Sequence, residues 1–224
     1  MTSFNNYVAI IGDISGSRQL NDRQEIQQKL KRLLSDINDR YKNDLSAQFT
    51  ITLGDEFQGL LHNRNNIFTI ITEIELILSP VEMRFGIGIG EITTDIQFEY
   101  SAEVDGPAYH RARKMIDQIE KLQSQYSKQK TNMMIDSGNE YLDQLLNSTL
   151  SLCTVLKSRW TARQKEIIYT YLNHNENQYK AAEYLEISQP SVNQVLNKSN
   201  FYSYKAAIDT VNSFLSNLGS RLND

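Results

Sequence analysis

The sequence predicts an α/β fold, an α+β sandwich of helices packed on a sheet, followed by a C-terminal all-α part. Two observations lead to this fold class. Strand-like and helix-like hydrophobic periods alternate over the first 137 residues, and strand-like segments disappear from Gly138 onward. With 224 residues, 40% hydrophobic content and only three prolines, the chain can bury a core in one or two domains. We therefore predict domains at residues 1–137 and 138–224.

The elements of the first domain follow from the local periods. One helix carries a single core-facing apolar stripe, made by Ile26, Leu30, Leu33, Leu34, Ile37 and Tyr41. Glycine and isoleucine alternate from Gly86 to Gly90, which leaves one face of a strand bare; we favour close packing of a helix there, with ligand approach near Gly90 and Glu91 as the alternative. In order, we expect strand 7–12, helix 22–43, strand 47–53, turn 54–56, strand 57–61, helix 65–78, strand 83–92, helix 107–126 and strand 132–135.

The second domain is expected to contain five helices. Leucines from Leu142 to Leu156 indicate a connecting helix, and three shorter helices and a final helix near 203–218 follow. Thr161 and Ser188 are predicted N-caps, and Pro190 falls in a first helical turn, where its missing N–H costs nothing. The three shorter helices are expected at 160–172, 178–185 and 189–197.

Composition excludes several classes of protein. The net charge of -4 and the pI of about 5.5 give no chain-wide attraction to nucleic acid or to an anionic membrane. Cys153 is the only cysteine, which excludes an internal disulfide, a thiolate zinc site and a Cys-X-X-Cys redox pair. No apolar run approaches the roughly 18 residues that span a bilayer, and the N-terminus has no secretory pattern. We expect a cytoplasmic protein without a membrane partner.

Acidic residues mark the ends of two neighbouring predicted strands. Asp13 follows the apolar run from Tyr7 to Ile11, and Asp55 and Glu56 lie at the tip of a predicted hairpin. If strand 7–12 is central and the hairpin pairs beside it, these carboxylates meet at one end of the sheet, where hard oxygen ligands hold Mg²⁺ or Mn²⁺. Gly54 suits the tip because glycine tolerates positive φ and lets a phosphate approach the backbone. The pattern indicates metal-dependent nucleotide chemistry, and its alternative is an ordinary hairpin.

These residues, with Asp13-Ile14-Ser15-Gly16-Ser17 before the hairpin and residues 84–92 after it, resemble a known catalytic domain. It is the palm shared by class III nucleotidyl cyclases and GGDEF diguanylate cyclases, and within that superfamily the chain is most similar to the SatD family. The resemblance covers about residues 5–136 and implies a ferredoxin-like palm of the nucleotidyl cyclase type. It implies that two Mg²⁺ or Mn²⁺ ions and a nucleoside triphosphate or other nucleotide bind there. The implied metal ligands are Asp13, the carbonyl of Ile14, Asp55 and Glu56.

The same resemblance implies phosphate-binding segments. Residues 13–22 have the spacing of the loop that wraps phosphates, in which Ser15, Gly16 and Ser17 can offer backbone N–H groups. Asn21, at the end of this loop, either caps the next helix or reads a base. The expected cofactor-binding residues are Ser15, Gly16, Ser17, Arg18, Gly54 and Arg113.

Residues 106–114 resemble the class III helix that carries a transition-state Asn and Arg. Those two positions hold His110 and Lys114 here, while Arg113 stands where GGDEF proteins have a phosphate-binding Lys. Phosphate-binding character is therefore kept, but the transition-state pair is not. Our candidate catalytic residues are His110, Arg113 and Lys114. His110 could act as a base if the neighbouring cations lower its pKa, and the alternative is an ordinary surface histidine.

Residues 160–198 resemble the helix-turn-helix of bacterial transcription factors. The turn position that is often Gly holds Glu186. Residues 157–205 carry a net charge of +3, whereas the rest of the chain carries -7, so the local positive field lies where DNA would dock. The alternative is a three-helix bundle used for protein contact or packing. The candidate DNA-binding residues are Gln189, Ser191, Asn193, Gln194 and Lys198.

The leading hypothesis is a regulator in which a metal-dependent nucleotide-binding palm controls a DNA-binding module, and a homodimer would suit both parts. The alternative is an active nucleotidyl cyclase or a related nucleotidyl or phosphoryl transferase. A pure interaction protein with a degenerate palm is the third possibility. The sequence does not name the base, the DNA site or the signal.

Overall fold

A five-stranded mixed sheet forms the centre of the protein. The structure, a computed structural model, describes residues 6–16, 22–52, 54–99, 101–125 and 130–221. The strand order is β2-β3-β1-β4-β5, in which β1 is antiparallel to β3 and β4, and β4 is parallel to β5. The first strand is central and pairs with the hairpin strand β3, so both conditions of the metal-site hypothesis are met. The strands are β1 (Tyr7–Ile14), β2 (Leu45–Ile51), β3 (Glu56–Leu61), β4 (Met83–Gly90) and β5 (Met133–Asp136).

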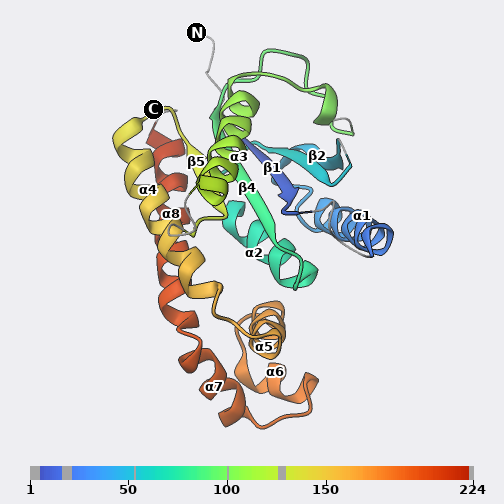
Figure 1. The fold of residues 1–224 in the computed structure, drawn as a ribbon, viewed down its shortest axis with the longest axis vertical. Helices are drawn as coiled ribbons and strands as arrows, with labels where there is room; N and C mark the ends of the chain where they lie inside the picture. Colours follow the sequence, from blue (N-terminus) through green and yellow to red (C-terminus); the bar gives the residue numbers. More distant parts are fainter. Residues whose placement is uncertain (1–5, 17–21, 53, 100, 126–129, 222–224) are drawn as a thin grey trace.

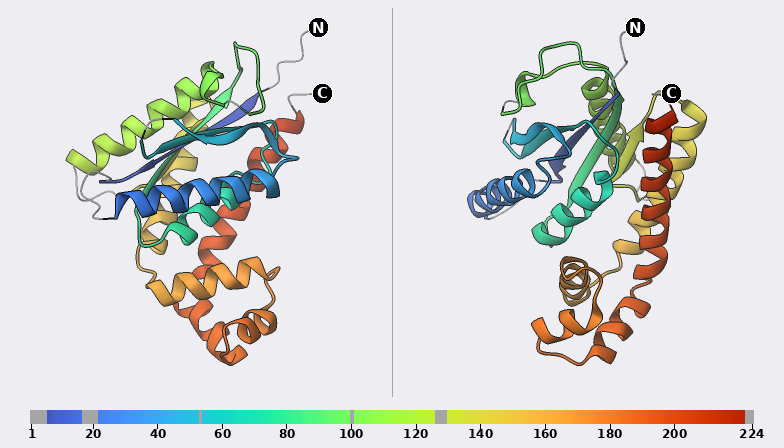
Figure 2. Two further views of the ribbon diagram at one scale, coloured as in Figure 1. Left: turned by 90° about the vertical axis from the view of Figure 1, so that its right-hand side faces the viewer. Right: turned by 180° about the vertical axis from the view of Figure 1, so that it is seen from behind.

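Helices cover both faces of this sheet. Figure 2 shows α3 (Pro107–Gln125) on one face and α1 (Arg23–Arg40) with α2 (Ile67–Leu78) on the other. A short 3-10 helix, η2 (Ser101–Glu103), precedes α3 and was not predicted. Within the described residues, none of the helices combines the length and the apolar character that a membrane crossing requires.

The C-terminal helices form a stem and a tip. α4 (Glu140–Lys157) packs on β5, and α8 (Phe201–Arg221) runs back beside α4 to reach α2 (Figure 1). The tip consists of α5 (Ala162–Asn173), α6 (Gln178–Tyr184) and α7 (Gln189–Lys198). All predicted helices and strands are present, and their ends differ from the predicted ones by no more than three residues.

The alternation of side chains along β1 produces two hydrophobic cores. Val8 and Ile10 join the larger core beneath α1 and α2, whereas Ala9 and Ile11 face the smaller core beneath α3. The larger core continues through α4 and α8, where Leu150 and Val211 belong to the same cluster as Val8. Residues on both sides of the predicted boundary at 137/138 therefore share one core.

The bare strand face at β4 is filled by a helix, as favoured from the sequence. A Cβ atom placed on Gly88 would lie 2.0 Å from the carbonyl oxygen of Ala108, and one on Gly86 would lie 2.1 Å from that of Ala112. The absence of side chains thus allows the backbone of α3 to lie directly on β4.

Capping interactions fix the predicted ends of the tip helices. The Thr161 side chain accepts a hydrogen bond from the N–H of Gln164, and the Gln164 side chain returns one to the Thr161 N–H. The Ser188 hydroxyl accepts from the N–H of Ser191 at the start of α7, where Pro190 occupies the first turn. Both N-cap predictions are confirmed.

Candidate functional site

Charged residues form a row across three adjacent strands at one end of the sheet. Asp13 in β1 is the cross-strand partner of Glu56 in β3 on one side and of Arg84 in β4 on the other. Its side chain shares the face of Ala9 and Ile11, beneath α3. Arg84 Nη1 lies 3.1 Å from Asp13 Oδ2 and 3.1 Å from Glu120 Oε1 of α3. The ion pair between Arg84 and Glu120 therefore ties this row of charged residues to α3.

The second carboxylate of this row is held by an arginine of α3. Arg113 makes a two-pronged ion pair with Glu56, in which Nη2 lies 2.6 Å from Oε1 and Nη1 contacts Oε2. The Thr52 hydroxyl also donates to Glu56 Oε1, at 3.0 Å. Each of the two neighbouring carboxylates, Asp13 and Glu56, thus has an arginine partner.

Asp55 is held from the opposite face of the sheet. Its Oδ2 lies 3.0 Å from Arg23 Nη2, and its Oδ1 accepts from Gln27 Nε2 at 2.8 Å, both on α1. Gln27 also donates to the carbonyl of Gly54, which has the positive φ, +64°, expected at the hairpin tip. The consecutive residues Asp55 and Glu56 are therefore bound by helices on opposite faces.

The predicted metal ligands are only partly brought together. Asp13 and Glu56 are adjacent on one face, whereas Asp55 binds α1, and each of the three forms an ion pair with arginine. Among the described residues, no group of three or more His, Cys, Asp or Glu side chains is arranged to hold a metal ion. A divalent cation at this end would have to replace arginine as the partner of Asp13 and Glu56.

The environment shifts the pKa values of the two carboxyls in opposite directions. Burial raises the pKa of Asp13, and the nearby Glu56 carboxylate adds to this, while Arg84 opposes it. For Glu56, burial acts in the same direction, but the hydrogen bonds and charge of Arg113 outweigh it and lower the pKa. Asp13 is thus the incompletely compensated member of the pair, and additional positive charge beside it would stabilise its ionised form.

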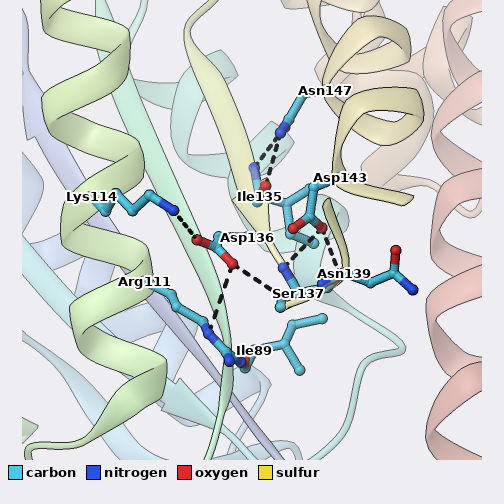
Figure 3. Close-up of polar contacts among 10 residues, drawn as sticks. Ile89, Arg111, Lys114, Ile135, Asp136, Ser137, Asn139, Asp143 and Asn147 are labelled. Carbon is cyan, nitrogen blue, oxygen red and sulfur yellow. Dashed lines mark hydrogen bonds and ion pairs between the residues drawn. The ribbon is translucent and has the colours of Figure 1, made fainter. Parts of the chain in front are cut away.

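The three candidate catalytic residues of α3 diverge. Arg113 binds Glu56, and Lys114 Nζ lies 2.8 Å from Asp136 Oδ2, on the side of β5 (Figure 3). His110 lies exposed on the surface, with Nε2 3.1 Å from Oδ1 of the equally exposed Asp105. The three side chains do not converge on one point, and the surroundings of His110 match its alternative interpretation as a surface histidine.

A polar network at the end of β5 was not predicted. The buried carboxylate of Asp136 binds Lys114, lies 3.7 Å from Arg111 Nε and accepts the N–H of Gly138 at 3.0 Å (Figure 3). Asn147 of α4 makes two hydrogen bonds of 2.8 Å with the backbone of Ile135. The network joins α3, β5 and α4. The sequence did carry a signal for this network, because Asp136 follows the short predicted strand 132–135 just as Asp13 follows its apolar run.

The loop after β1 is described only in part. The backbone N–H of Ser15 donates to the Glu82 carbonyl at 2.8 Å, so the expectation that it is available to a phosphate is wrong in this conformation. Gly16 has φ of +66° and open space around its Cα. Ser17, Arg18 and Asn21 lie outside the described residues. The N-cap of α1 is Asp22, without a side-chain capping hydrogen bond.

The tip helices present a polar surface on α7. Val192 and Leu196 are buried, while four of the five predicted DNA-binding residues, Ser191, Asn193, Gln194 and Lys198, are exposed. Gln189, the fifth, is half-buried and donates to the side chain of Gln178, which also contacts Asn193. Glu186 has φ of +53°, in the left-handed region that favours glycine at this turn.

Comparisons with known proteins identify a family and distant structural neighbours. The sequence model of the SatD family matches residues 7–213. None of the curated proteins compared matches the chain. Similar solved structures include the dimeric guanylyl cyclase domain of the RhoGC fusion protein from the aquatic fungus Blastocladiella emersonii (16% identity, TM-score 0.39, 50% of this chain and 73% of that chain). Another is the guanylate cyclase domain of RhGC from Catenaria anguillulae in complex with GTP (15% identity, TM-score 0.39, 50% of this chain and 72% of that chain). A third is a bacterial light-regulated adenylyl cyclase (12% identity, TM-score 0.38, 59% of this chain and 76% of that chain).

Proposed function

The chain belongs to the SatD family, and we propose that its sheet half binds a nucleotide with a divalent cation and controls a DNA-binding helix-turn-helix at the tip. The observation that carries the first half of this proposal is the Asp13–Glu56 carboxylate pair with its two arginines, Arg84 and Arg113. These four residues come from three strands and one helix that meet at the end of the central strand.

Partner exchange makes this cluster suitable for a metal–nucleotide complex. When Mg²⁺ or Mn²⁺ is bound, Asp13 and Glu56 would hold it through hard oxygen ligands, and the ion would supply positive charge to phosphate oxygens. Arg84 and Arg113, released from these carboxylates, would be free to bind phosphate, for which guanidinium is well shaped. The carboxylates are then neutralised by arginines in the ligand-free protein and by the metal ion in the complex, where the arginines neutralise phosphate. Asp55 can act as a third metal ligand only if its ion pair with Arg23 breaks.

Regulation is favoured over turnover by the residues of α3. A cyclase needs groups that hold the transition state more tightly than the ground state, and the resemblance places His110 and Lys114 at those positions. Lys114 is bound to Asp136, and His110 lies beside Asp105 at the surface. Neither side chain lies where it would stabilise a transition state at the Asp13–Glu56 cluster, which favours a binding role for the cluster.

The proposed DNA contact is supported by the exposure and chemistry of α7. Gln194 and Asn193 carry amide groups suited to adenine, and Lys198 at the end of the helix is suited to phosphate. The tip lies at the end of the molecule away from the sheet, beyond α2 (Figure 1), and this position leaves room for a DNA duplex. A homodimer with two such tips would read paired half-sites.

Titration calorimetry with ATP and GTP, with and without Mg²⁺, tests the nucleotide proposal. We expect Mg²⁺-dependent heat and a higher melting temperature with wild type, both lost in Asp13→Asn and in Glu56→Gln. Asp39→Asn, which neutralises an exposed carboxylate near the C-terminal end of α1, is the control and should bind normally. Absence of heat and of any melting shift with every nucleotide would reject the proposal.

The DNA proposal is tested with a fragment of the protein's own promoter. Retention should fall steeply as salt rises, and the double variant Gln194→Ala, Lys198→Ala should abolish it. Equal retention of wild type and variant would contradict the assignment of α7. Mass analysis of the same protein after incubation with mixed nucleoside triphosphates and Mg²⁺ separates regulation from turnover, because only an enzyme produces a new nucleotide.

A further inference from the structure

A cavity of about 460 Å³ lies where the sheet half meets the C-terminal helices. Its walls come from α2, the start of β4, the segment before β5, the end of α4, α5 and α8, with Ser15 after β1 and Gln123 of α3 also in the lining. This volume falls in the range that accommodates small organic ligands. The Asp13 and Glu56 side chains are not part of its lining.

One wall of the cavity contains a buried ion pair. Lys157 Nζ lies 2.6 Å from both carboxylate oxygens of Glu75, and Asn132 donates to Glu75 Oε1 as well. The side chains of Lys157 and Glu75 are only 11% and 16% exposed. The Glu75 charge is therefore compensated inside the protein, and this carboxylate does not repel an incoming anion strongly.

Two further lysines give the lining a positive surplus. Lys165 of α5 donates to the Ser79 hydroxyl at 3.2 Å, and Lys130 lies at the exposed rim. Neither Lys165 nor Lys130 takes part in an ion pair within the described residues. Glu82, an exposed rim residue, is the second acidic residue of the lining. Three lysines thus face two glutamates.

Another part of the lining is apolar and contains an aromatic ring. Leu76, Val81 and Met83 line it together with Trp160. The indole N–H of Trp160 already donates to the Ser199 carbonyl at 2.8 Å, so the part of the ring that faces the cavity offers apolar contact.

We propose that this cavity binds a small organic anion, an apolar or aromatic body that carries one carboxylate or phosphate group. The anionic group would be held by Lys165, with Lys130 at the entrance, and the apolar body would pack against Trp160. This site does not include the Asp13–Glu56 pair, although it adjoins the proposed nucleotide site through Ser15 and through Gln123, the hydrogen-bond partner of Arg84. It joins α2, which packs on the sheet, to α5, which begins the tip, so an occupant would bridge the two halves of the protein.

Trp160 is the only tryptophan of the chain, so its fluorescence reports directly from the cavity wall. Wild-type protein is titrated with phenyl phosphate, benzoate, inorganic phosphate and the uncharged benzyl alcohol, with calorimetry in parallel. We expect saturable binding of at least one of the two aromatic anions, weaker binding of inorganic phosphate and none of benzyl alcohol. Binding of phenyl phosphate alone or benzoate alone identifies which anionic group the site prefers.

Lys165→Met should weaken the binding of the preferred aromatic anion about tenfold or more, the effect of losing one charged hydrogen bond. Arg163→Met is the matched control, because Arg163 lies on the same helix and pairs with Glu166 at the surface; it should leave the affinity unchanged. Asp13→Asn should also leave the affinity unchanged, whether or not the protein binds nucleotides.

Three results would overturn the proposal. The first is no fluorescence change and no heat with either aromatic anion. The second is a lack of anion specificity, seen either as benzyl alcohol binding as tightly as the aromatic anions or as Lys165→Met binding the preferred anion as tightly as wild type. The third is loss of the response in Asp13→Asn, because the cavity would then belong to the nucleotide site rather than form a second one.

Discussion

Neighbouring carboxyls at the end of β1 respond to the fold in opposite ways. Folding raises the pKa of Asp13, so its contribution to the free energy of unfolding is fully present below its ordinary value, 3.8, and is lost as pH rises through the raised value. Folding lowers the pKa of Glu56, so its contribution is present above 4.5 and is lost as pH falls through the lowered value. At neutral pH, the ionised Asp13 therefore lowers the free energy of unfolding. Its role as a metal ligand in the proposed function would explain why a carboxylate is kept there.

Asp13→Asn is expected to raise the melting temperature at pH 7 by a few degrees, because it removes a half-buried charge while Arg84 keeps Glu120 and Gln123 as partners. The gain should be smaller at pH 4, where the wild-type carboxyl is closer to protonation. Glu56→Gln should do the reverse and destabilise more at pH 7 than at pH 4. Thermal unfolding of the three proteins at both pH values measures this. Equal effects of pH on all three would contradict it.

The buried pair of Glu75 and Lys157 offers a second prediction for single residues. Lys157→Met should lower the free energy of unfolding by about 3–5 kcal/mol, because it leaves a buried carboxylate without its cation. The double variant Glu75→Leu, Lys157→Met should recover most of this loss. The exposed pair of Arg163 and Glu166 is the control, and Arg163→Ala should change the stability by less than about 1 kcal/mol. Equal costs at the two pairs, measured by urea unfolding, would show that burial is not the cause.

At the scale of elements, the contact between β4 and α3 sets the position of Arg113 over Glu56. Gly88→Ala should destabilise the protein by about 1–3 kcal/mol, because the new methyl group would lie 2.0 Å from the Ala108 carbonyl and would push α3 away. Gly90→Ala should cost less, since its nearest atom, the Ala108 nitrogen, lies at 3.0 Å. Thermal unfolding and nucleotide titration of both variants check the order, and a larger loss in Gly90→Ala would refute it.

The turn between α6 and α7 carries a strained residue. Glu186→Gly should stabilise the tip by up to about 1 kcal/mol, because glycine adopts the positive φ of this position without steric cost. Glu183→Gly, inside the neighbouring helix α6, should destabilise by about 1 kcal/mol and serves as the opposite control. Thermal unfolding followed by circular dichroism measures both. Destabilisation by both glycines would mean that the turn does not set the geometry of the tip.

At the scale of the whole molecule, the larger core joins the two predicted domains. α4 and α8 complete this core, because Leu150 and Val211 cluster with Val8 of the central strand. We therefore expect a single cooperative unfolding transition for the chain, and no cooperative transition for a fragment of residues 1–137. Two separate transitions of the full chain, or a stable 1–137 fragment, would support independent domains instead.

Ile168 and Leu196 of the tip belong to the same cluster, but the part of the core beneath the sheet is expected to persist when the tip is removed. The rings of Trp160 and Phe201 are in contact, with centroids 6.3 Å apart, so a short Gly-Ser linker can replace residues 161–199. The shortened protein should still unfold cooperatively and bind nucleotide with Mg²⁺, but should no longer retain promoter DNA. Nucleotide titration and DNA retention of the same preparation measure this, and loss of nucleotide binding would show that the tip contributes to that site.

The sequence by itself determined the helices and strands, because hydrophobic periods and capping residues act locally, whereas the pairing of β1 with β4 came only from the structure. It favoured close packing on the bare face from Gly86 to Gly90, and the structure shows that α3 is the helix that packs there. It placed Asp13 and Glu56 at one end of the sheet. Only the tertiary structure decided which charges pair, because partners such as Arg84 and Arg113 are brought in by elements far along the chain.

The same reason explains what the sequence did not indicate. Adjacent residues at the hairpin tip bind helices on opposite faces, so Asp55 is drawn to α1 while Glu56 is drawn to α3. The cavity between Lys165 and Trp160 exists only where α2, α4, α5 and α8 meet. Local pattern specifies the faces of helices and strands, but the pairing of long charged side chains and the gaps between elements depend on how those elements pack in three dimensions.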